Sequence, residues 1–258
     1  MPAPILVIDF ETFFDDEYHM GRDAKALTTI EYVQDARFEV LGCGFLRIPG
    51  DVNGVDHEGQ TTFKIGEEAV ADHLGWLVDQ FGDNLERCTC TAQNAVFDCT
   101  ILARRYGIHP PHIIDILGLA RHWHSRSNND LAALCKRHGL KDKGETSDFK
   151  GLTLRTRFKR AKGRGPKMPI LMPKATDEQL GKLSEYGLND VIQEWILFTL
   201  LLPKLSNAPV EIALMNHTLN LALQPSLEVD YARAEEIKGK MQAELDEAVR
   251  KVMGFYGD

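Results

Sequence analysis

Acidic side chains near the N-terminus have the type and spacing to bind divalent metal ions. Asp9 and Glu11 follow an apolar run at residues 5–8 that is typical of a buried strand. Because side chains alternate along a strand, both carboxylates point to one face, roughly 6.5–7 Å apart. They repel each other unless a cation neutralises them, and such oxygen ligands suit Mg²⁺ or Mn²⁺. A solvated strand end is the alternative interpretation, since acidic pairs with this spacing also arise by chance.

Another acid stands near the predicted start of a helix. A short strand at residues 88–92 is followed by Asn94, whose side chain is suited to cap a helix running from residue 95 to about residue 106. Asp98 then lies in the first turn of this helix, where an acid also complements the helix dipole. The two residues are therefore either part of a site or only a cap and a dipole partner.

A third motif consists of Tyr186 and Asp190 on a long predicted helix. The helix begins at a capping box, residues 176–179, and continues to residue 202. Residues four apart on a helix are neighbours on one face, so the tyrosine and the carboxylate lie together. Taken alone, the pair is more typical of a core tyrosine and a surface acid than of a site.

The elements that must position these motifs predict a mixed α/β sheet flanked by helices. The first strand and the strands at residues 39–48 and 61–65 indicate an antiparallel meander, and strands at residues 88–92 and 113–115 then alternate with helices. Gly42 and Gly44 lie in the second strand, but the rest of a nucleotide-binding fingerprint is missing. Helices are predicted at residues 28–32, 67–81, 95–106, 116–123, 129–138, 176–202, 209–223 and 231–253.

Length and composition are those of an ordinary soluble protein, with 258 residues, 43% of them hydrophobic and 26% charged. The longest apolar run of the C-terminal half is broken at Thr199 and Pro203, so no membrane association is expected. The N-terminus lacks the pattern of a secretion signal. Five cysteines without a framework spacing favour a reducing compartment, and hence a cytoplasmic location.

A basic segment contrasts with the net charge of −8. Between Phe149 and Thr176 the chain contains nine Lys or Arg residues and no acid. Such a segment could follow a phosphate backbone while the acidic remainder holds metal, or it could be a solvated, flexible loop. Arg155, Arg157 and Lys159 are the candidates for contact with a nucleic acid.

Taken in order, the three motifs resemble those of the DEDD superfamily of 3′–5′ exonucleases. This superfamily has Asp-x-Glu on the first strand, Asn-x-x-aromatic-Asp at a helix start and Tyr-x-x-x-Asp on a late helix. The sequence contains Asp9-Phe-Glu11, Asn94-x-x-Phe97-Asp98 and Tyr186-x-x-x-Asp190. Glu185 stands where the histidine branch has its histidine, so the resemblance is to the tyrosine branch. It implies a ribonuclease H-like fold.

Residues 4–205 are similar to the proofreading domain of bacteriophage polymerases related to DNA polymerase I. The similarity is carried by Gln93-Asn94-Ala-Val-Phe97-Asp98, Ile114-Asp115, Asp130-Leu-Ala-Ala-Leu134, Gly139-Leu-Lys-Asp-Lys-Gly144 and Glu31-Tyr-Val-Gln-Asp-Ala-Arg-Phe38. It implies an exonuclease domain at residues 1–205 and a helical segment at residues 206–258 that resembles the junction to a polymerase domain. A phage-encoded protein would lie in the cytoplasm of the host cell.

The resemblance implies a metal-dependent enzyme that removes nucleoside 5′-monophosphates from a single-stranded or frayed 3′ end of DNA. A polymerase domain or replication proteins are the implied partners. Two alternatives stay open. One is a 3′–5′ exoribonuclease, and the other is a catalytically idle domain that binds nucleic acid or docks a polymerase.

The resemblance also implies a role for each residue of the motifs. Two Mg²⁺ or Mn²⁺ ions would be bound by four acids, Asp9, Glu11, Asp98 and Asp190. Tyr186 would orient the attacking water. Thr12 and Asn94 would hold the terminal nucleotide, and Phe97 would pack behind the site.

Overall fold

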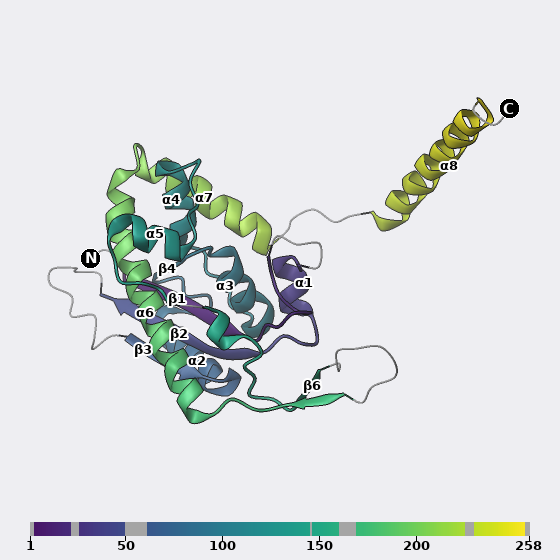
Figure 1. Cartoon of the computed structure of the whole chain (residues 1–258). Helices are drawn as coiled ribbons and strands as arrows, with labels where there is room; N and C mark the ends of the chain where they lie inside the picture. The colour runs from purple at the N-terminus through teal and green to yellow at the C-terminus, as the bar shows by residue number, and fades with distance from the viewer. Residues whose placement is uncertain are drawn as a thin grey trace. The chain divides into compact units, whose positions relative to one another are not determined.

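The sheet is built around β1 (Ile5–Thr12), whose residues Leu6, Val7 and Ile8 are buried, as their apolar run predicts. In the computed structural model, five strands lie in the order β3-β2-β1-β4-β5. The strands β2 (Val40–Ile48) and β3 (Thr61–Ile65) continue from β1 as an antiparallel meander, whereas β4 (Thr89–Ala92) and β5 (Ile113–Asp115) run parallel to β1 (Figure 1). The predicted mixed sheet is thus confirmed. The structure describes residues 3–21, 26–49, 61–144, 146–159, 169–224 and 230–255.

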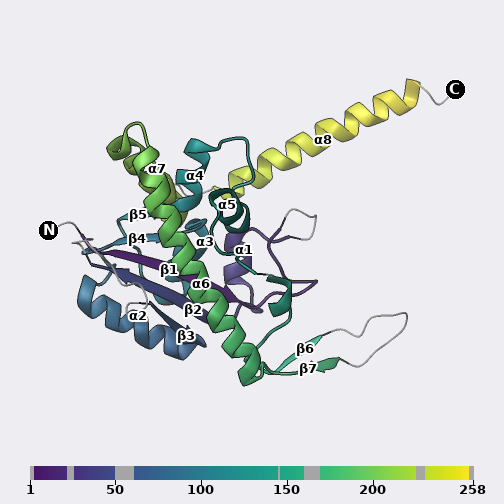
Figure 2. The same ribbon diagram turned by 60° about the vertical axis from the view of Figure 1, so that its left-hand side comes forward.

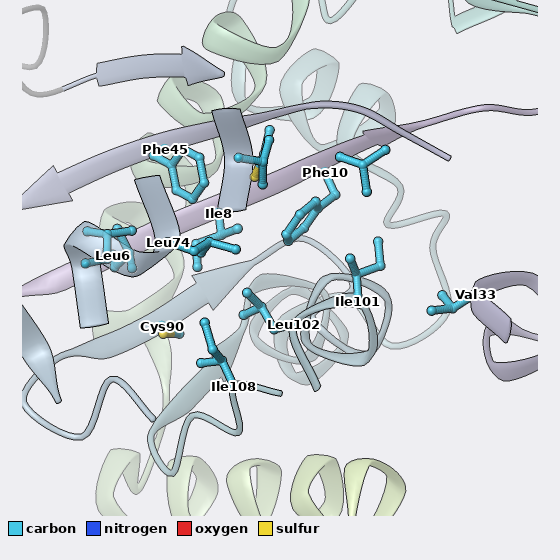
Figure 3. Packing of buried hydrophobic residues seen from close by; sticks show 14 of the residues in the cluster. Leu6, Ile8, Phe10, Val33, Phe45, Leu74, Cys90, Ile101, Leu102 and Ile108 are labelled. Carbon is cyan, nitrogen blue, oxygen red and sulfur yellow. The ribbon is translucent and has the colours of Figure 1, made fainter. Parts of the chain in front are cut away.

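Helices cover both faces of this sheet. On one face α1 (Thr29–Gln34), α2 (Glu67–Phe81) and α3 (Val96–Ile101) pack against Leu6, Ile8 and Phe10 of β1 (Figure 3). The opposite face, which includes Val7, is covered by α4 (Ile116–Trp123), α5 (Leu131–His138) and α6 (Asp177–Leu201) (Figure 2). These helices lie within a few residues of the predicted ranges, except where α3 is shortened, because buried apolar positions recur at helical spacing.

Glycines allow α6 to lie close against β2. A Cβ atom at Gly44 would come within 2.9 Å of the carbonyl oxygen of Gly187, and one at Gly187 would come within 2.4 Å of the Phe63 ring. In the strand pairing, Gly44 stands opposite Asp9. The missing side chains therefore let the backbone of a helix approach the strands next to the first acids of the sequence.

The structure differs from the sequence prediction in one helix and in one hairpin of the described residues. The helix expected over residues 95–106 is α3 followed by a π-helical turn, Leu102–Tyr106, which ends at Gly107 with a left-handed φ of 69°. The hairpin of β6 (Arg157–Lys159) and β7 (Ile170–Met172) has no counterpart in the prediction (Figure 2). Strands of three residues are too short to show alternation in the sequence.

The chain forms two compact units, Met1–Leu223 and Gln224–Asp258. Helix α7 (Ala208–Leu223) belongs to the first unit, where the Asn216 side chain accepts a hydrogen bond from the Ile113 N–H and donates one to the Pro111 carbonyl, both at 2.8 Å. In the second unit, the side chains of α8 (Tyr231–Phe255) are exposed in the part that the structure describes. The division at residue 205 stays a prediction.

All five cysteines are buried and none forms a disulfide. Burial raises the pKa of the Cys135 thiol to about 11 and that of the Cys43 and Cys99 thiols well above the ordinary value. Within the described ranges, no helix combines the length and the apolar character needed to cross a membrane.

Candidate active site

Three of the predicted acids meet at one place. Asp9 and Glu11 project from the same face of β1, and Asp190 reaches them from the middle of α6. One carboxylate oxygen of each residue lies within 4.8 Å of the other two. Asp190 is fully buried, whereas Asp9 and Glu11 are half-buried. Carboxylates from two distant segments are thus placed where one cation could contact them together.

The fourth predicted acid, Asp98, is not one of the three residues that meet, and it lies on the first turn of α3. Its buried carboxylate accepts a hydrogen bond of 2.9 Å from the backbone N–H of Phe10, the residue between the two acids of β1. Burial, followed by the charge of Asp9, raises the pKa of Asp98 well above its ordinary value. Asp98 therefore joins α3 to β1 and adds its charge to the same region.

These acids lack sufficient cationic partners, and their pKa values are raised accordingly. Burial raises the pKa of Asp9. Burial and, after it, the charge of Asp9 raise the pKa of Glu11 well above its ordinary value. The same two causes raise the pKa of Asp190 to about 7. The Oδ2 atom of Asp9 and the Oδ1 atom of Asp190 are buried without a hydrogen-bond partner among the described residues. Oxygen atoms in this state fit a divalent cation, which would supply both charge and ligation.

Asp115, at the end of β5, holds the turn that carries the second motif. Its Oδ1 atom accepts hydrogen bonds from the backbone N–H groups of Asn94, Ala95 and Leu117 at 3.0–3.1 Å. The prediction of Asn94 as N-cap is wrong: Ala95 is the N-cap, and the exposed Asn94 adopts a φ of 63°. Asp115 belongs to the pair Ile114-Asp115 of the phage-polymerase similarity, and its place between a strand and a helix start is the sequence signal for this capping role.

Another acid of this region, Glu194, was not predicted. It lies one turn after Asp190 on α6, is 1% exposed, and its Oε2 atom is buried without a partner in the described part of the chain. The backbone N–H of Gln93 donates a hydrogen bond to its carboxylate, while burial, followed by the charges of Asp9 and Asp98, raises its pKa well above the ordinary value. Its spacing of four residues from Asp190 is the signal in the sequence.

Predicted substrate residues line a cavity of about 320 Å³ beside the acids. Thr12, Phe97 and Tyr186 are among its walls. The Thr12 hydroxyl donates to the Tyr32 hydroxyl at 2.9 Å, because the hydrogen of Tyr32 goes to a backbone carbonyl. Burial raises the pKa of Tyr186 to about 12, so its hydroxyl keeps its proton. Asn94 lies instead in a neighbouring cavity of about 920 Å³.

Lys143, which was not predicted as a site residue, lies between these two cavities and borders both. Its ammonium group forms an ion pair with Asp190 and stands 4.7 Å from the centroid of the Tyr186 ring. Burial lowers the pKa of Lys143, but the charges of Asp9 and Asp190 outweigh this effect and raise it. It belongs to the stretch Gly139-Leu-Lys-Asp-Lys-Gly144 of the phage-polymerase similarity, but nothing in the sequence marked this lysine as a partner of Asp190.

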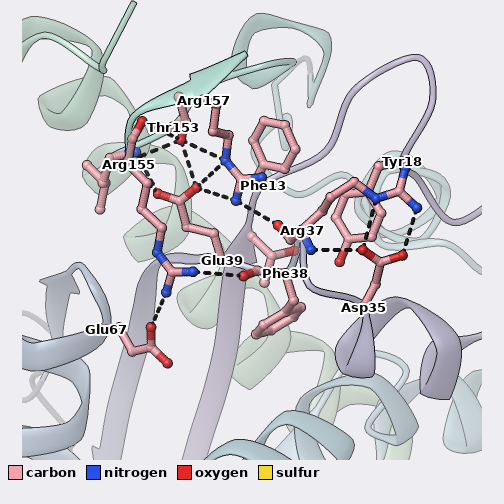
Figure 4. A network of polar contacts seen from close by, with 12 residues as sticks. Phe13, Tyr18, Asp35, Arg37, Phe38, Glu39, Glu67, Thr153, Arg155 and Arg157 are labelled. Atoms are coloured by element: carbon pink, nitrogen blue, oxygen red, sulfur yellow. Dashed lines mark hydrogen bonds and ion pairs between the residues drawn. The ribbon is translucent and has the colours of Figure 1, made fainter. Parts of the chain in front are cut away.

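The predicted basic residues Arg155 and Arg157 contact carboxylates away from this site (Figure 4). Buried Glu39 accepts a hydrogen bond from the backbone N–H of Arg155 at 3.0 Å and pairs with the Arg157 guanidinium at 2.7 Å. The Arg155 guanidinium pairs with Glu67. The side chain of Lys159 lies outside the described residues. Contact of these residues with nucleic acid stays a prediction.

Comparison with solved structures supports the fold class of this chain. Neither a protein-family model nor a curated protein matches the sequence. RNase D of Trypanosoma brucei is similar in structure, with a TM-score of 0.51 and 12% sequence identity. The similarity covers 86% of this chain and 65% of RNase D, so this chain spans about two thirds of the length of RNase D. NrnC of Brucella melitensis with bound Mg²⁺ has a TM-score of 0.46 and 15% identity, over 88% of this chain and 89% of that one. The first similarity, together with the sheet order, confirms the ribonuclease H-like α/β fold.

Proposed function

We propose that the chain is a metal-dependent 3′–5′ exonuclease that hydrolyses the terminal phosphodiester of DNA and releases nucleoside 5′-monophosphates. The observation that supports this most is the meeting of Asp9, Glu11 and Asp190 within 4.8 Å, with Asp98 bonded to the backbone of Phe10 between the first two. Buried carboxylates that repel one another cost stability unless a cation joins them. Their concentration beside one cavity therefore favours a reaction that uses bound metal.

Two Mg²⁺ or Mn²⁺ ions would be held by four acids, Asp9, Glu11, Asp98 and Asp190. When bound, the ions would make a nucleophile from water and stabilise the leaving 3′-oxygen. The chain's own groups would place the reacting atoms. Tyr186 keeps its proton, with a pKa of about 12, and its hydroxyl can orient the attacking water from the cavity wall. Glu11 lines the same cavity and can accept a hydrogen bond from that water.

The cavity of about 320 Å³ has a volume suited to one nucleotide. Phe97 offers an aromatic surface to its base or sugar, and the Thr12 hydroxyl, which lines the cavity, can accept a hydrogen bond from the 3′ end. Asn94, in the neighbouring cavity, would contact the strand beside the terminal nucleotide. Contacts of this kind read little base sequence, so selection of an unpaired 3′ end is expected.

DNA is proposed as the substrate because residues 4–205 resemble phage proofreading domains. The same resemblance supports a polymerase domain or replication proteins as partners. Hydrolysis of a phosphodiester in RNA would use the same acids and the same tyrosine of the protein, so a 3′–5′ exoribonuclease is the second candidate.

The test is a time course on a 5′-labelled single-stranded DNA oligonucleotide and on its RNA counterpart. Each is incubated with Mg²⁺, with Mn²⁺ or with EDTA. The variants are Asp9→Asn and Asp190→Asn, and the matched control is Glu185→Gln, which removes an exposed acid from the same helix as Asp190. A ladder that shortens from the 3′ end, needs metal and is lost in both aspartate variants but not in the control is expected on DNA.

Other outcomes have distinct meanings. A ladder mainly on RNA would favour the exoribonuclease. Binding of both oligonucleotides without any cleavage would refute the enzyme and favour the catalytically idle domain.

A further inference from the structure

Lys143 holds a position that a metal ion would also need. Its ammonium group pairs with the Oδ2 atom of Asp190, whose other oxygen is buried and unpartnered. The same positive charge acts on Asp9 and Glu11. A metal ion bound to the free oxygen of Asp190 would stand close to the ammonium group, and the repulsion between the two positive charges favours departure of the lysine.

The surroundings of Lys143 leave it room to move. The residue lies in a loop that turns at Gly139 and Gly144, with φ angles of 67° and 86°, and that ends before the 3₁₀ turn Thr146–Phe149. The loop is fixed to α6 by a hydrogen bond of 3.3 Å from the Asn189 side chain to the Asp142 carbonyl. Rotation of the lysine side chain alone, without unfolding of any element, would therefore carry its charge from Asp190 into either cavity.

A released ammonium group next to the substrate needs another anion. Lys143 is partly buried, with a side chain 21% exposed, and a charge in such surroundings is costly without a partner. One of the two cavities that it borders is lined by Asp9 and Glu11, where the proposed reaction places a nucleic-acid backbone. A phosphate of that backbone is the anion within reach.

We propose that Lys143 is an exchangeable cation of the active site. It neutralises Asp190 before metal binds, yields this carboxylate to the metal ion, and then contacts a backbone phosphate of the nucleic acid. The inference rests on the proposed function, and it adds a substrate-binding residue outside the three acidic motifs.

The first experiment measures two affinities of the wild type and of Lys143→Met. Calorimetric titration with Mn²⁺ near neutral pH should show at least about tenfold tighter binding by the variant, because the competing charge is gone. Fluorescence anisotropy with a DNA oligonucleotide, protected by phosphorothioate linkages at its 3′ end and mixed with Mg²⁺, should show at least about threefold weaker binding. Lys141→Met, an exposed lysine of the same loop, is the matched control and should change neither affinity.

These opposite signs separate exchange from a structural role, because a damaged site would lose both affinities. Equal or weaker Mn²⁺ binding by Lys143→Met overturns the exchange. Tighter Mn²⁺ binding with an unchanged DNA affinity overturns the contact with phosphate. Absence of Mn²⁺ binding in the wild type would refute the proposed function itself.

A second measurement uses the wild type alone and so does not depend on folding of the variant. Lysines are acetylated briefly with acetic anhydride, and the modification of Lys143 is followed by mass spectrometry. Mn²⁺ should increase the modification of Lys143, and the protected oligonucleotide should then reduce it. A rate that is unchanged by Mn²⁺ overturns the proposal.

Discussion

At the scale of the residue, the acids of the site are buried in a way that favours their protonated forms. Desolvation is the largest cause of the raised pKa of Asp9, Glu11, Asp98 and Asp190, and mutual repulsion adds to it for the last three. Lys143 supplies part of the missing positive charge. Stability and metal binding are therefore coupled through these residues.

We predict that the metal-free protein loses stability as the pH rises from about 4, the ordinary range of a carboxylic acid, to about 7. Between these limits the coupled acids of the folded site keep a proton that they have released in the unfolded state. Proton release on unfolding means that each increase in pH lowers the free energy of unfolding. The raised pKa values of Glu11 and Asp98 act in the same direction. Urea denaturation in EDTA across this range measures the slope.

Two comparisons check the origin of this slope. Asp190→Asn should show a shallower loss of stability with pH, and saturating Mg²⁺ should reduce the loss in the wild type. A metal-free protein that becomes more stable over this range would contradict the predicted protonation.

At the scale of the element, the distance between α6 and β2 decides where Asp190 lies. We predict that Gly44→Ala destabilises the protein by about 1–3 kcal/mol and lowers the exonuclease rate by displacing α6. The added methyl would meet the backbone of Gly187 and the side chain of Val191, both at 2.9 Å, and the backbone cannot rotate away. Thermal unfolding and the rate on the DNA oligonucleotide measure the two effects.

Gly181→Ala is the matched control for this change. It lies on α6 as well, but a Cβ atom there would meet nothing within 4 Å. Alanine should stabilise this helix by about 0.5–1 kcal/mol and leave the rate unchanged. Equal effects of the two substitutions would show that the approach of α6 does not control the site.

The β6–β7 hairpin is held at its base by the pair of Glu39 and Arg157, whose side chains are 2% and 13% exposed. We predict that Arg157→Gln costs roughly 1.5–3 kcal/mol of stability, because a buried carboxylate loses a charged hydrogen-bond donor. The salt dependence of DNA binding should stay the same, since this guanidinium already has a protein partner. Thermal unfolding and binding at several salt concentrations test both statements. A flatter salt dependence would instead support the contact of Arg157 with a phosphate that the sequence predicts.

At the scale of the whole molecule, the compact unit ends at Leu223. We predict that a chain ending at Leu223 keeps the melting temperature and the rate of the full chain, whereas one ending at residue 205 loses both. The shorter chain lacks α7, whose Leu219 and Leu223 are buried against Ala95, Cys99 and Ile113. It also leaves the backbone N–H of Ile113 without the acceptor Asn216. Similar melting temperatures of the two chains would support the boundary at residue 205.

Much of this architecture follows from local signals in the sequence. The range of α2, the strands β3 and β5, and the capping box of α6 agree with prediction because apolar spacing and cap chemistry are set by neighbouring residues. Contacts across the chain have no such signal. Glu39 meets Thr153 and Arg157 more than a hundred residues away, and Lys143 reaches Asp190 from a loop.

The second motif shows how such a distant contact changes a local prediction. Asn94 has the right residue type to cap a helix, but Asp115 of the adjacent strand accepts the N–H groups of the turn. The asparagine is thereby left exposed with a positive φ. Residue type alone could not predict which of the two side chains would satisfy these amides.

The burial of every cysteine makes the protein suitable for site-specific labelling. A maleimide dye reacts with an accessible thiolate, and all five native thiols are enclosed in the fold. A single cysteine introduced at Ser147, an exposed residue of the turn that follows the Lys143 loop, would then be modified selectively without removal of the native thiols. A dye at this position would let single-molecule fluorescence follow the passage of an oligonucleotide through the protein.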